Sequence, residues 1–279
     1  LDSKDIILAS FPKSGNTWVR AFIHNLFTDA RTPFDINEMS QLTHGDSNAK
    51  WFFDNDGCDP TQLSDKEIGS RRFLAHQRMS DTSVDSVLVK THNAMVEDGG
   101  KPMISNELTG AAIYIVRNPL DVVVSYADHL GVSIEKMIEG MATKNFRSPA
   151  SNTHVPEIYC DWSTHVKSWT QIDTPALHIV KYEDMKLNPN RTFSSIANFM
   201  GLTPSRDRLR RAIKFSSFKV LQSQEKRRGF IERTPVQKSF FRKGSINGWR
   251  TTLSKQEVKK ITEFHKEQME RFDYIPEDL

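Results

Sequence analysis

The sequence is poor in cysteine and contains no long apolar run. Cys58 and Cys160 are the only cysteines among 279 residues, too few for a disulfide framework or a cysteine-based zinc site. No apolar run approaches the ~18 residues that a membrane-spanning helix needs, and residues 1–10 lack a basic segment followed by a long apolar one. These absences argue against secretion and membrane anchoring, and they indicate a reducing, cytoplasmic location.

The chain also lacks the composition of disordered or fibrous proteins, since 37% of its residues are hydrophobic and only 13 are glycine. Its net charge is only +3, but residues 206–243 hold 13 lysines or arginines against 3 acidic residues, so the rest of the chain is negative. One basic segment on an acidic body suits a small polyanion better than a nucleic acid bound along a face. A solvated charged loop remains the alternative interpretation of this segment.

Predicted strands alternate with predicted helices along the chain. Residues 5–11 form a short apolar run closed by Pro12, and from Thr17 the apolar spacing fits one face of a helix. Further strands are predicted over residues 86–90, 111–116 and 176–182. This alternation predicts one α/β domain over residues 1–279, with a mostly parallel central sheet flanked by helices and ligands at the carboxyl ends of its strands.

Capping residues indicate where several helices begin and end. Asn118 is a candidate N-cap for a helix that starts at a proline and runs to about Leu130. Ser254 and Glu257 form a candidate capping box for the closing helix.

The stretches 45–85 and 131–157 lack clear periodicity and are candidate lids. Trp51, Phe52 and Phe53, together with residues 131–157, are candidates to line a substrate pocket or to pack in the core.

The strongest local pattern is residues 11–18, FPKSGNTW, which place a lysine, a glycine and two hydroxyls before a predicted helix. Backbone N–H groups at a helix start and the Lys13 ammonium together predict an anion site, although a plain strand-to-helix turn is the alternative. The pattern GxxxxGK[ST] of nucleotide triphosphatases is absent, because Lys13 precedes Gly15. This order of residues counts against a metal-dependent kinase.

Residues 12–18, PKSGNTW, resemble the 5′-phosphosulfate-binding loop, PKSGTTW, of the cytosolic sulfotransferase family. That family uses 3′-phosphoadenosine 5′-phosphosulfate (PAPS) and releases the desulfated nucleotide PAP. Three more segments resemble the family's motifs in order and spacing: residues 89–92 (VKTH), 114–126 (YIVRNPLDVVVSY) and 241–244 (FRKG). The resemblance spans about residues 6–250 and implies a P-loop-like phosphosulfate-binding loop.

The resemblance implies in-line transfer of a sulfuryl group from PAPS to a hydroxyl, or an amine, of a small-molecule acceptor. Such a transfer depends on positioning and charge neutralisation and needs no metal. His92 is implied as the general base, while Lys13 and Lys90 are implied to neutralise charge on the leaving oxygen and the sulfonate oxygens. A structural histidine and a solvated lysine are the alternatives at positions 92 and 90.

A larger set of residues is implied to bind PAPS. Arg117 and Ser125 are assigned to the 3′-phosphate together with the RKG segment, whose glycine permits close backbone approach. Trp18 and Phe218 are candidates for stacking on adenine, or for plain core packing. The implied donor-binding residues are Lys13, Ser14, Gly15, Asn16, Thr17, Trp18, Arg117, Ser125, Tyr182, Ser216, Ser217, Phe218, Phe241, Arg242, Lys243 and Gly244.

The sequence departs from the family pattern at two places. The C-terminal loop RKGxxGDWK reads RKGSINGWR over residues 242–250, so Gly-Asp is replaced by Asn-Gly at 247–248 and the closing geometry of the loop is in question. The vertebrate-type dimer motif KxxxTVxxxE would begin at Arg250, and Lys255 and Lys259 replace its valine and glutamate. That dimer is therefore not expected.

Two other functions fit parts of the sequence. A P-loop nucleotide kinase would bind a nucleoside triphosphate with magnesium. A non-catalytic nucleotide- or RNA-binding module would use the basic residues 206–243, but no aromatic-rich recognition strand accompanies them. We expect neither nucleic acid nor a membrane as a partner.

Overall fold

A computed structural model describes residues 5–53 and 59–277. The described chain forms two compact units: unit 1 contains residues up to 11, 43–114 and 140–179, and unit 2 contains residues 12–42, 115–139 and 180 onward. The single domain over residues 1–279 stays a prediction. Cys160 is buried as a free thiol, whereas Cys58 lies outside the described residues.

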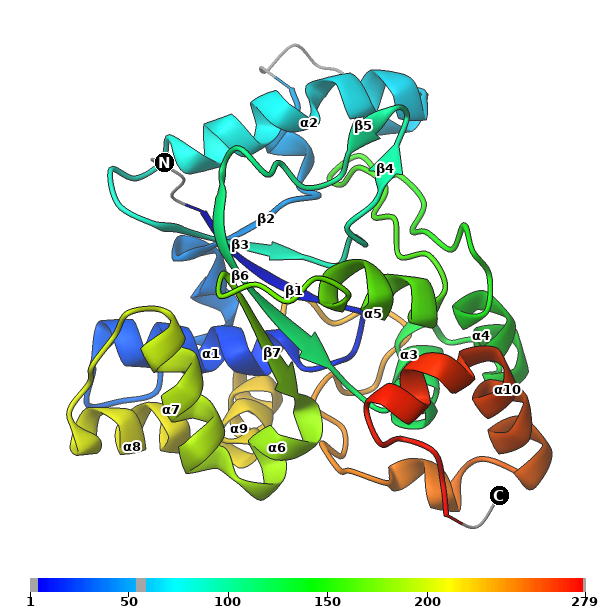
Figure 1. The fold of residues 1–279 in the computed structure, drawn as a ribbon. Helices are drawn as coiled ribbons and strands as arrows, with labels where there is room; N and C mark the ends of the chain where they lie inside the picture. Colours follow the sequence, from blue (N-terminus) through cyan, green and yellow to red (C-terminus); the bar gives the residue numbers. More distant parts are fainter. Residues whose placement is uncertain (1–4, 54–58, 278–279) are drawn as a thin grey trace. The chain divides into compact units, whose positions relative to one another are not determined.

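The central sheet has five strands in the order β2-β3-β1-β6-β7 (Figure 1). These strands are β1 (Asp5–Ser10), β2 (Thr43–Gly45), β3 (Val87–Thr91), β6 (Thr109–Val116) and β7 (Leu177–Lys181). β3 pairs in parallel with both β1 and β2, and Ile7 lies opposite Val89. Ile7, Leu8 and Ala9 are fully buried, which explains the continuous apolar run of an interior parallel strand. The predicted parallel sheet is confirmed.

Unit 1 also contains the helices α2 (Asp65–Ser80) and α5 (Trp162–Thr170), and the hairpin of β4 (Glu97–Asp98) and β5 (Lys101–Pro102). α2 packs beside β3 and beside the β4–β5 hairpin (Figure 1). The stretch 45–85, aperiodic in the sequence, thus contains a helix of 16 residues. Polar Arg72 and His76 are among its buried residues, so it carries no continuous apolar stripe.

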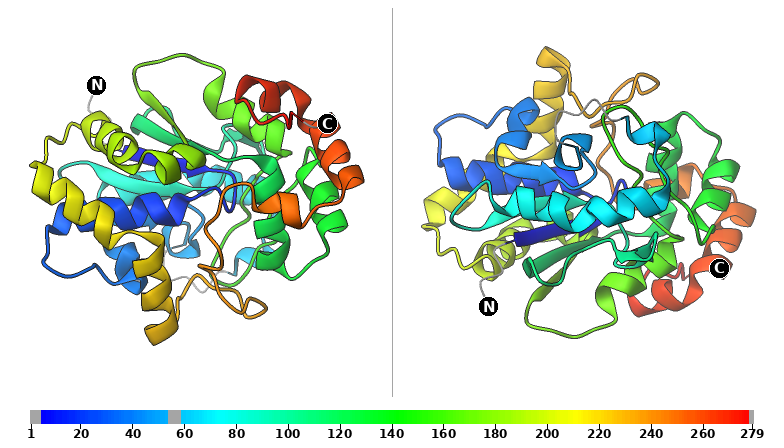
Figure 2. Two further views of the ribbon diagram at one scale, coloured as in Figure 1. Left: turned by 90° about the horizontal axis from the view of Figure 1, so that it is seen from below. Right: turned by 90° about the horizontal axis from the view of Figure 1, so that it is seen from above.

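Unit 2 consists mainly of helices. They are α1 (Asn16–Thr28), α3 (Pro119–Leu130), most of α4 (Ile134–Met141), α6 (Tyr182–Leu187), α7 (Pro189–Phe199), α8 (Arg206–Phe215), α9 (Phe218–Arg228) and α10 (Lys255–Arg271). α1 and α8 lie side by side (Figure 2, left). The Asn118 cap of α3 and the Ser254–Glu257 capping box of α10 are confirmed.

Short 3₁₀ helices connect several of these elements: η1 (Ile36–Gln41), η2 (Ala49–Trp51), η3 (Pro60–Gln62) and η4 (Gly248–Thr251). The candidate lid 131–157 contains α4, and the lid role of both stretches stays a prediction. Within residues 5–53 and 59–277, no helix combines the length and the apolar character needed to cross a membrane.

Candidate functional site

The loop before α1 in unit 2 forms an anion cradle. Gly15 is the N-cap of α1 with φ 109°, and a Cβ there would lie 2.8 Å from Cδ2 of Tyr182, so this close approach requires glycine. Because the N-cap is glycine, no side chain caps the first turn, which begins at Asn16 and Thr17. Ser14 Oγ is buried and has no hydrogen-bond partner among the described residues. The loop therefore offers donors to an anion.

The Lys13 ammonium in this loop is half-buried and has no counterion among the described residues. Its Nζ lies 3.7 Å from the ring centroid of Phe240 and 3.5 Å from Nδ1 of His129. Lys13 forms no ion pair within the described part of the chain. Burial, reinforced by the charge of Arg117, lowers the pKa of Lys13 to about 7. An anion bound at the loop would stabilise the charged form of this lysine.

Arg117 joins the loop to the C-terminal segment of unit 2. Its Nη1 donates to the carbonyl of Lys13 at 2.8 Å and its Nη2 donates to the carbonyl of Ser245 at 3.3 Å. Its Nε is buried and has no partner in the described chain, and its Cζ lies 4.2 Å from the ring centroid of Tyr182. Ser125 lies on α3, and within the described chain no hydrogen bond joins it to Arg117.

Two carboxylates anchor the C-terminal loop of residues 239–249. Glu225 accepts hydrogen bonds from the backbone N–H groups of residues 240 and 241, at 2.6 and 2.9 Å. Asp121 accepts from the N–H groups of Asn247 and Trp249, at 2.8 and 3.0 Å. Asn247 has φ 57°, and asparagine is one of the few residues besides glycine that adopt this left-handed conformation readily. The Asn-Gly replacement is therefore compatible with a closed loop.

The predicted RKG segment lies within this loop. Gly244 has φ 55°, and a Cβ there would overlap the ring of Phe218 at the start of α9. Arg242 lies 3.6 Å from the carboxylate of Asp128, and Lys243 is exposed. The segment thus packs closely on Phe218 through its glycine and keeps its two cations at the surface.

The other predicted donor residues differ in their surroundings. Lys186 Nζ lies 5.6 Å from the ring centroids of both Trp18 and Phe218, so both candidate adenine-stacking rings border one cation that the sequence analysis missed. Phe241 is buried in an aromatic cluster. Ser217 is the N-cap of α9, whereas Ser216 is fully buried and its Oγ donates to carbonyls of α8. Ser216 therefore stabilises the end of that helix.

In unit 1, His92 follows β3 directly and is held by the backbone. Its Nδ1 lies 2.7 Å from the carbonyl oxygen of Ser10, so Nδ1 carries the proton and Nε2 keeps a free lone pair. Burial and the neighbouring charge of Lys90 lower the pKa of His92 to about 3. The imidazole is therefore neutral at pH 7, and its Nε2 can accept a proton.

Lys90 is already paired with a carboxylate. Its Nζ lies 3.0 Å from Oε1 of Glu157, and the hydroxyl of Tyr159 donates to the other oxygen at 3.1 Å. Burial raises the pKa of Glu157, but the charge and hydrogen bond of Lys90 more than offset this effect and bring the pKa to about 2, so this carboxylate stays ionised. The sequence analysis missed Glu157, because 67 residues separate it from Lys90 and no local pattern links them.

His165 holds the backbone of His92 from the other side. Its Nε2 lies 3.1 Å from the carbonyl oxygen of His92, and the Tyr114 hydroxyl lies 2.9 Å from its Nδ1. This geometry makes Nε2–H the donor to His92 and Nδ1 the acceptor from Tyr114. His165 therefore fixes the chain at the end of β3. In the described residues, no group of three or more histidines, cysteines or carboxylates could hold a metal ion.

Unit 2 thus contains a loop that offers donors to an anion. Unit 1 contains a neutral imidazole beside a lysine–glutamate pair. The chain is similar in sequence to several sulfotransferases. The flavonol 3-sulfotransferase of Flaveria bidentis is 26% identical, over 95% of this chain and 81% of the relative. Rat sulfotransferase 2A1 is 24% identical, over 96% of this chain and 86% of the relative.

A solved structure has the same fold. The crystal structure of a mouse sulfotransferase complexed with PAP matches with a TM-score of 0.64 at 20% identity, and the match covers 97% of this chain and 85% of that one. A family model described as sulfotransferase domain matches residues 3–273. Because that match spans nearly the whole chain, the protein belongs to the sulfotransferase family.

Proposed function

We propose that the protein transfers the sulfuryl group of PAPS to a hydroxyl, or an amine, of a small-molecule acceptor. The observation that carries this proposal is the half-buried Lys13 ammonium, which has no counterion within the described residues and lies in a loop before a helix that no side chain caps. Membership of the sulfotransferase family supports it. The mouse sulfotransferase of the same fold was solved with PAP bound, which supports PAPS as the donor. The Flaveria relative is named for a flavonol, which supports a small-molecule acceptor.

The residues of unit 2 fit the donor. Lys13, the Ser14 hydroxyl and the backbone amides of residues 14–17 would hold its 5′-phosphosulfate, since they are donors that lack an anion. When bound, PAPS would supply the sulfuryl group and a stable leaving group. Lys13 would stabilise the negative charge that develops on that leaving oxygen.

The 3′-phosphate is proposed to bind Arg117, Ser125 and the RKG segment of residues 242–244. The partnerless Nε of Arg117 supports this assignment, because a buried guanidinium N–H gains a partner when a phosphate binds. Trp18 and Phe218 are proposed to contact adenine, beside the cation of Lys186.

In unit 1, His92 is proposed as the general base that takes the proton of the acceptor hydroxyl at Nε2. The Ser10 carbonyl supports this role, because it keeps the proton on Nδ1. Lys90 is proposed to neutralise sulfonate oxygens, with Glu157 moderating its charge. We further propose a cytoplasmic location and no nucleic-acid or membrane partner.

Replacing His92 by alanine tests the proposal. We expect His92→Ala to lower turnover by about 10² to 10⁴ fold, the usual contribution of a general base, with PAP affinity unchanged. His154→Ala, at an exposed histidine of the same unit, is the matched control and should keep full turnover. Turnover would be measured with radiolabelled PAPS and PAP affinity by calorimetry. Wild-type turnover in His92→Ala would show that His92 is not the general base. Failure of the wild-type protein to bind PAP would refute the proposal that PAPS is the donor.

A further inference from the structure

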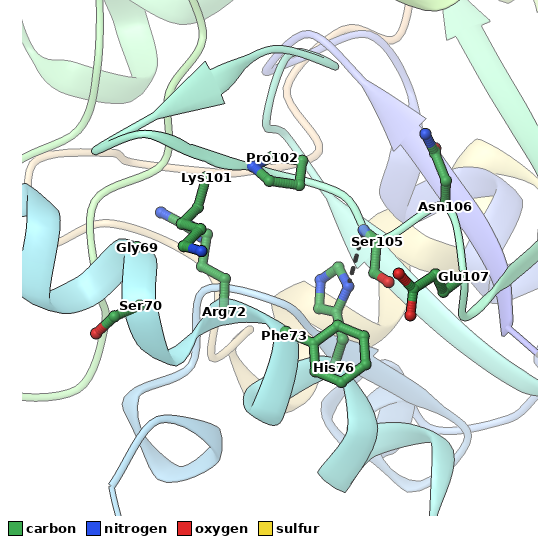
Figure 3. A pocket seen from close by; sticks show the side chains of 10 residues that line it. All are labelled: Gly69, Ser70, Arg72, Phe73, His76, Lys101, Pro102, Ser105, Asn106 and Glu107. Atoms are coloured by element: carbon green, nitrogen blue, oxygen red, sulfur yellow. Dashed lines mark hydrogen bonds between the residues drawn. The ribbon is translucent and has the colours of Figure 1, made fainter.

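Unit 1 contains a pocket of about 270 Å³ to which the proposed function assigns no role (Figure 3). One wall is α2 and the other is formed by β5 and the segment that follows it. The lining residues that bear on its chemistry are Arg72, Phe73, His76, Lys101, Pro102 and Ser105.

Arg72 supplies a buried positive charge to this pocket. The residue is only 4% exposed, and its sole hydrogen bond to the described residues runs from Nη2 to the carbonyl of Pro156 at 3.3 Å. Its Nε is buried and lacks a hydrogen-bond partner in the same set of residues. A buried guanidinium with unused donors is costly unless an acceptor reaches it.

Four carboxylates act electrostatically on Arg72, but none forms an ion pair with it in the described chain. Asp65 and Asp98 both pair with Arg147, at 2.8 and 3.0 Å, and Glu157 pairs with Lys90. Asp46 accepts a hydrogen bond from Asn93 at Oδ2, and its Oδ1 has no hydrogen-bond partner among the described residues. These carboxylates partly offset the positive charge of Arg72, but none of them accepts a hydrogen bond from its free N–H groups.

Two further donors border the same pocket. The backbone N–H of Ser105 donates to Nδ1 of His76 at 3.3 Å, so the other ring nitrogen, Nε2, carries the proton (Figure 3). Burial and Arg72 lower the pKa of His76 to about 4, so the ring is a neutral donor at pH 7. Lys101 adds an exposed ammonium at the rim, where Glu107 also lies.

The rim of the pocket also offers apolar surface. The Phe73 side chain is 50% exposed, and Pro102 is exposed on the opposite wall. An aromatic ring and a proline beside cationic donors suit a ligand with a charged head and a flat apolar body. We propose that this pocket binds a small phosphate or sulfate ester, with its oxyanion at Arg72, His76 and Lys101 and its apolar body against Phe73 and Pro102.

Phenyl phosphate is a suitable probe, because it combines both features and has no hydroxyl acceptor. It would be titrated into protein saturated with PAP, so that the donor loop is occupied, while the ring resonances of His76 are followed by NMR. A His76→Gln variant assigns those resonances. We expect a saturable shift of the His76 signals and weaker binding of inorganic phosphate than of phenyl phosphate.

Charge reversal at the rim distinguishes a site from general attraction. Lys101→Glu should weaken phenyl phosphate binding about tenfold or more, whereas Lys66→Glu, at an exposed position of α2 outside the pocket, should change it less than about twofold. Both substitutions are at exposed positions, so the test does not depend on altering buried Arg72.

A shift that does not saturate, or equal weakening by both substitutions, would mean an adventitious ion only and would overturn the proposal. Equal affinity for phosphate and phenyl phosphate would overturn the role of the apolar rim. The readout contains no sulfuryl transfer, so failure of this site is distinguishable from failure of the proposed function.

Discussion

The proposed contact of Lys13 with the donor makes PAP binding depend on pH. The free protein holds this ammonium with a pKa of about 7, because burial and Arg117 both oppose its charge. An anion bound at the loop favours the charged form, so binding near and above pH 7 must take up a proton. PAP affinity should therefore fall as pH rises from 7 to 9, by up to about tenfold per unit.

Calorimetry in two buffers of different ionisation enthalpy would measure the proton uptake directly. Lys13→Arg keeps its charge throughout this range and should remove the pH dependence, even if it binds PAP less tightly. An affinity of the wild-type protein that is constant from pH 7 to pH 9 would contradict the lowered pKa of Lys13.

At the residue scale, sequence reasoning found groups whose neighbours in the chain identify them. Lys13 precedes a glycine and a helix start, and His92 follows Lys-Thr at the end of a strand. Glu157 and His165 were missed because their roles come from contacts with residues 67 and 73 positions away, which no local pattern records.

At the scale of elements, the close packing of Gly244 on α9 gives a direct test of the donor loop. Alanine at 244 would meet two obstacles, the left-handed φ of 55° and the ring of Phe218. Gly201 shares the first obstacle, with φ 73°, but a Cβ there has no neighbour within 4 Å in the described chain. Gly201→Ala is therefore the matched control for backbone strain.

Gly201→Ala should lower the free energy of unfolding by about 1–2 kcal/mol, the usual cost of placing alanine in this conformation, and Gly244→Ala should lower it by more, because its Cβ also overlaps the Phe218 ring. Only Gly244→Ala should also weaken PAP binding, by about tenfold or more, because the loop must move to clear Phe218. Chemical denaturation and calorimetry measure the two effects. Equal PAP affinity in both variants would contradict the proposal that the RKG segment binds the donor.

The elements that the sequence predicted are those with apolar periodicity or a clear cap. β1 and α3 appear close to the predicted bounds, because one is a buried apolar run and the other begins with Asn-Pro. α2 was not predicted although Ser64 and Glu67 form a capping box, because its buried face includes polar residues and gives no apolar stripe. The buried polar residues that hide α2 in the sequence are those that line its pocket.

At the scale of the molecule, the basic segment 206–243 falls in α8, α9 and the loop that follows, all in unit 2. Part of its charge is neutralised within that unit, because Arg211 pairs with Asp29 and Arg228 pairs with Asp35. The count of charged residues in the sequence predicted that an anion binds to this segment, but it did not indicate which of the cations contact the anion. The cations left for a ligand are therefore fewer than the sequence count suggests.

The whole chain should lose stability in mild acid, because both units bury neutral histidines. Burial lowers the pKa of His24 and His92 to about 3, and that of His76, His129 and His165 to about 4. In the unfolded chain these groups titrate near 6.5, so protons bind the unfolded state more strongly. Their contribution is complete above pH 6.5 and is lost as pH falls toward 4.

A histidine with a folded pKa of about 4 contributes about 2 kcal/mol of this loss at pH 5. Asp46 opposes the trend, because burial raises its pKa to about 6 and it gains a proton in the folded state below that pH. Burial also raises the pKa values of Asp5, Asp121 and Glu183, which oppose the trend in the same way. We expect the five histidines to outweigh these four carboxyl groups, so urea denaturation should show a lower free energy of unfolding at pH 5 than at pH 7. His165→Gln should lower stability at pH 7 but make its decline toward pH 5 shallower. A stability that is constant or rises between pH 6.5 and pH 5 would contradict the neutral, buried state of these histidines.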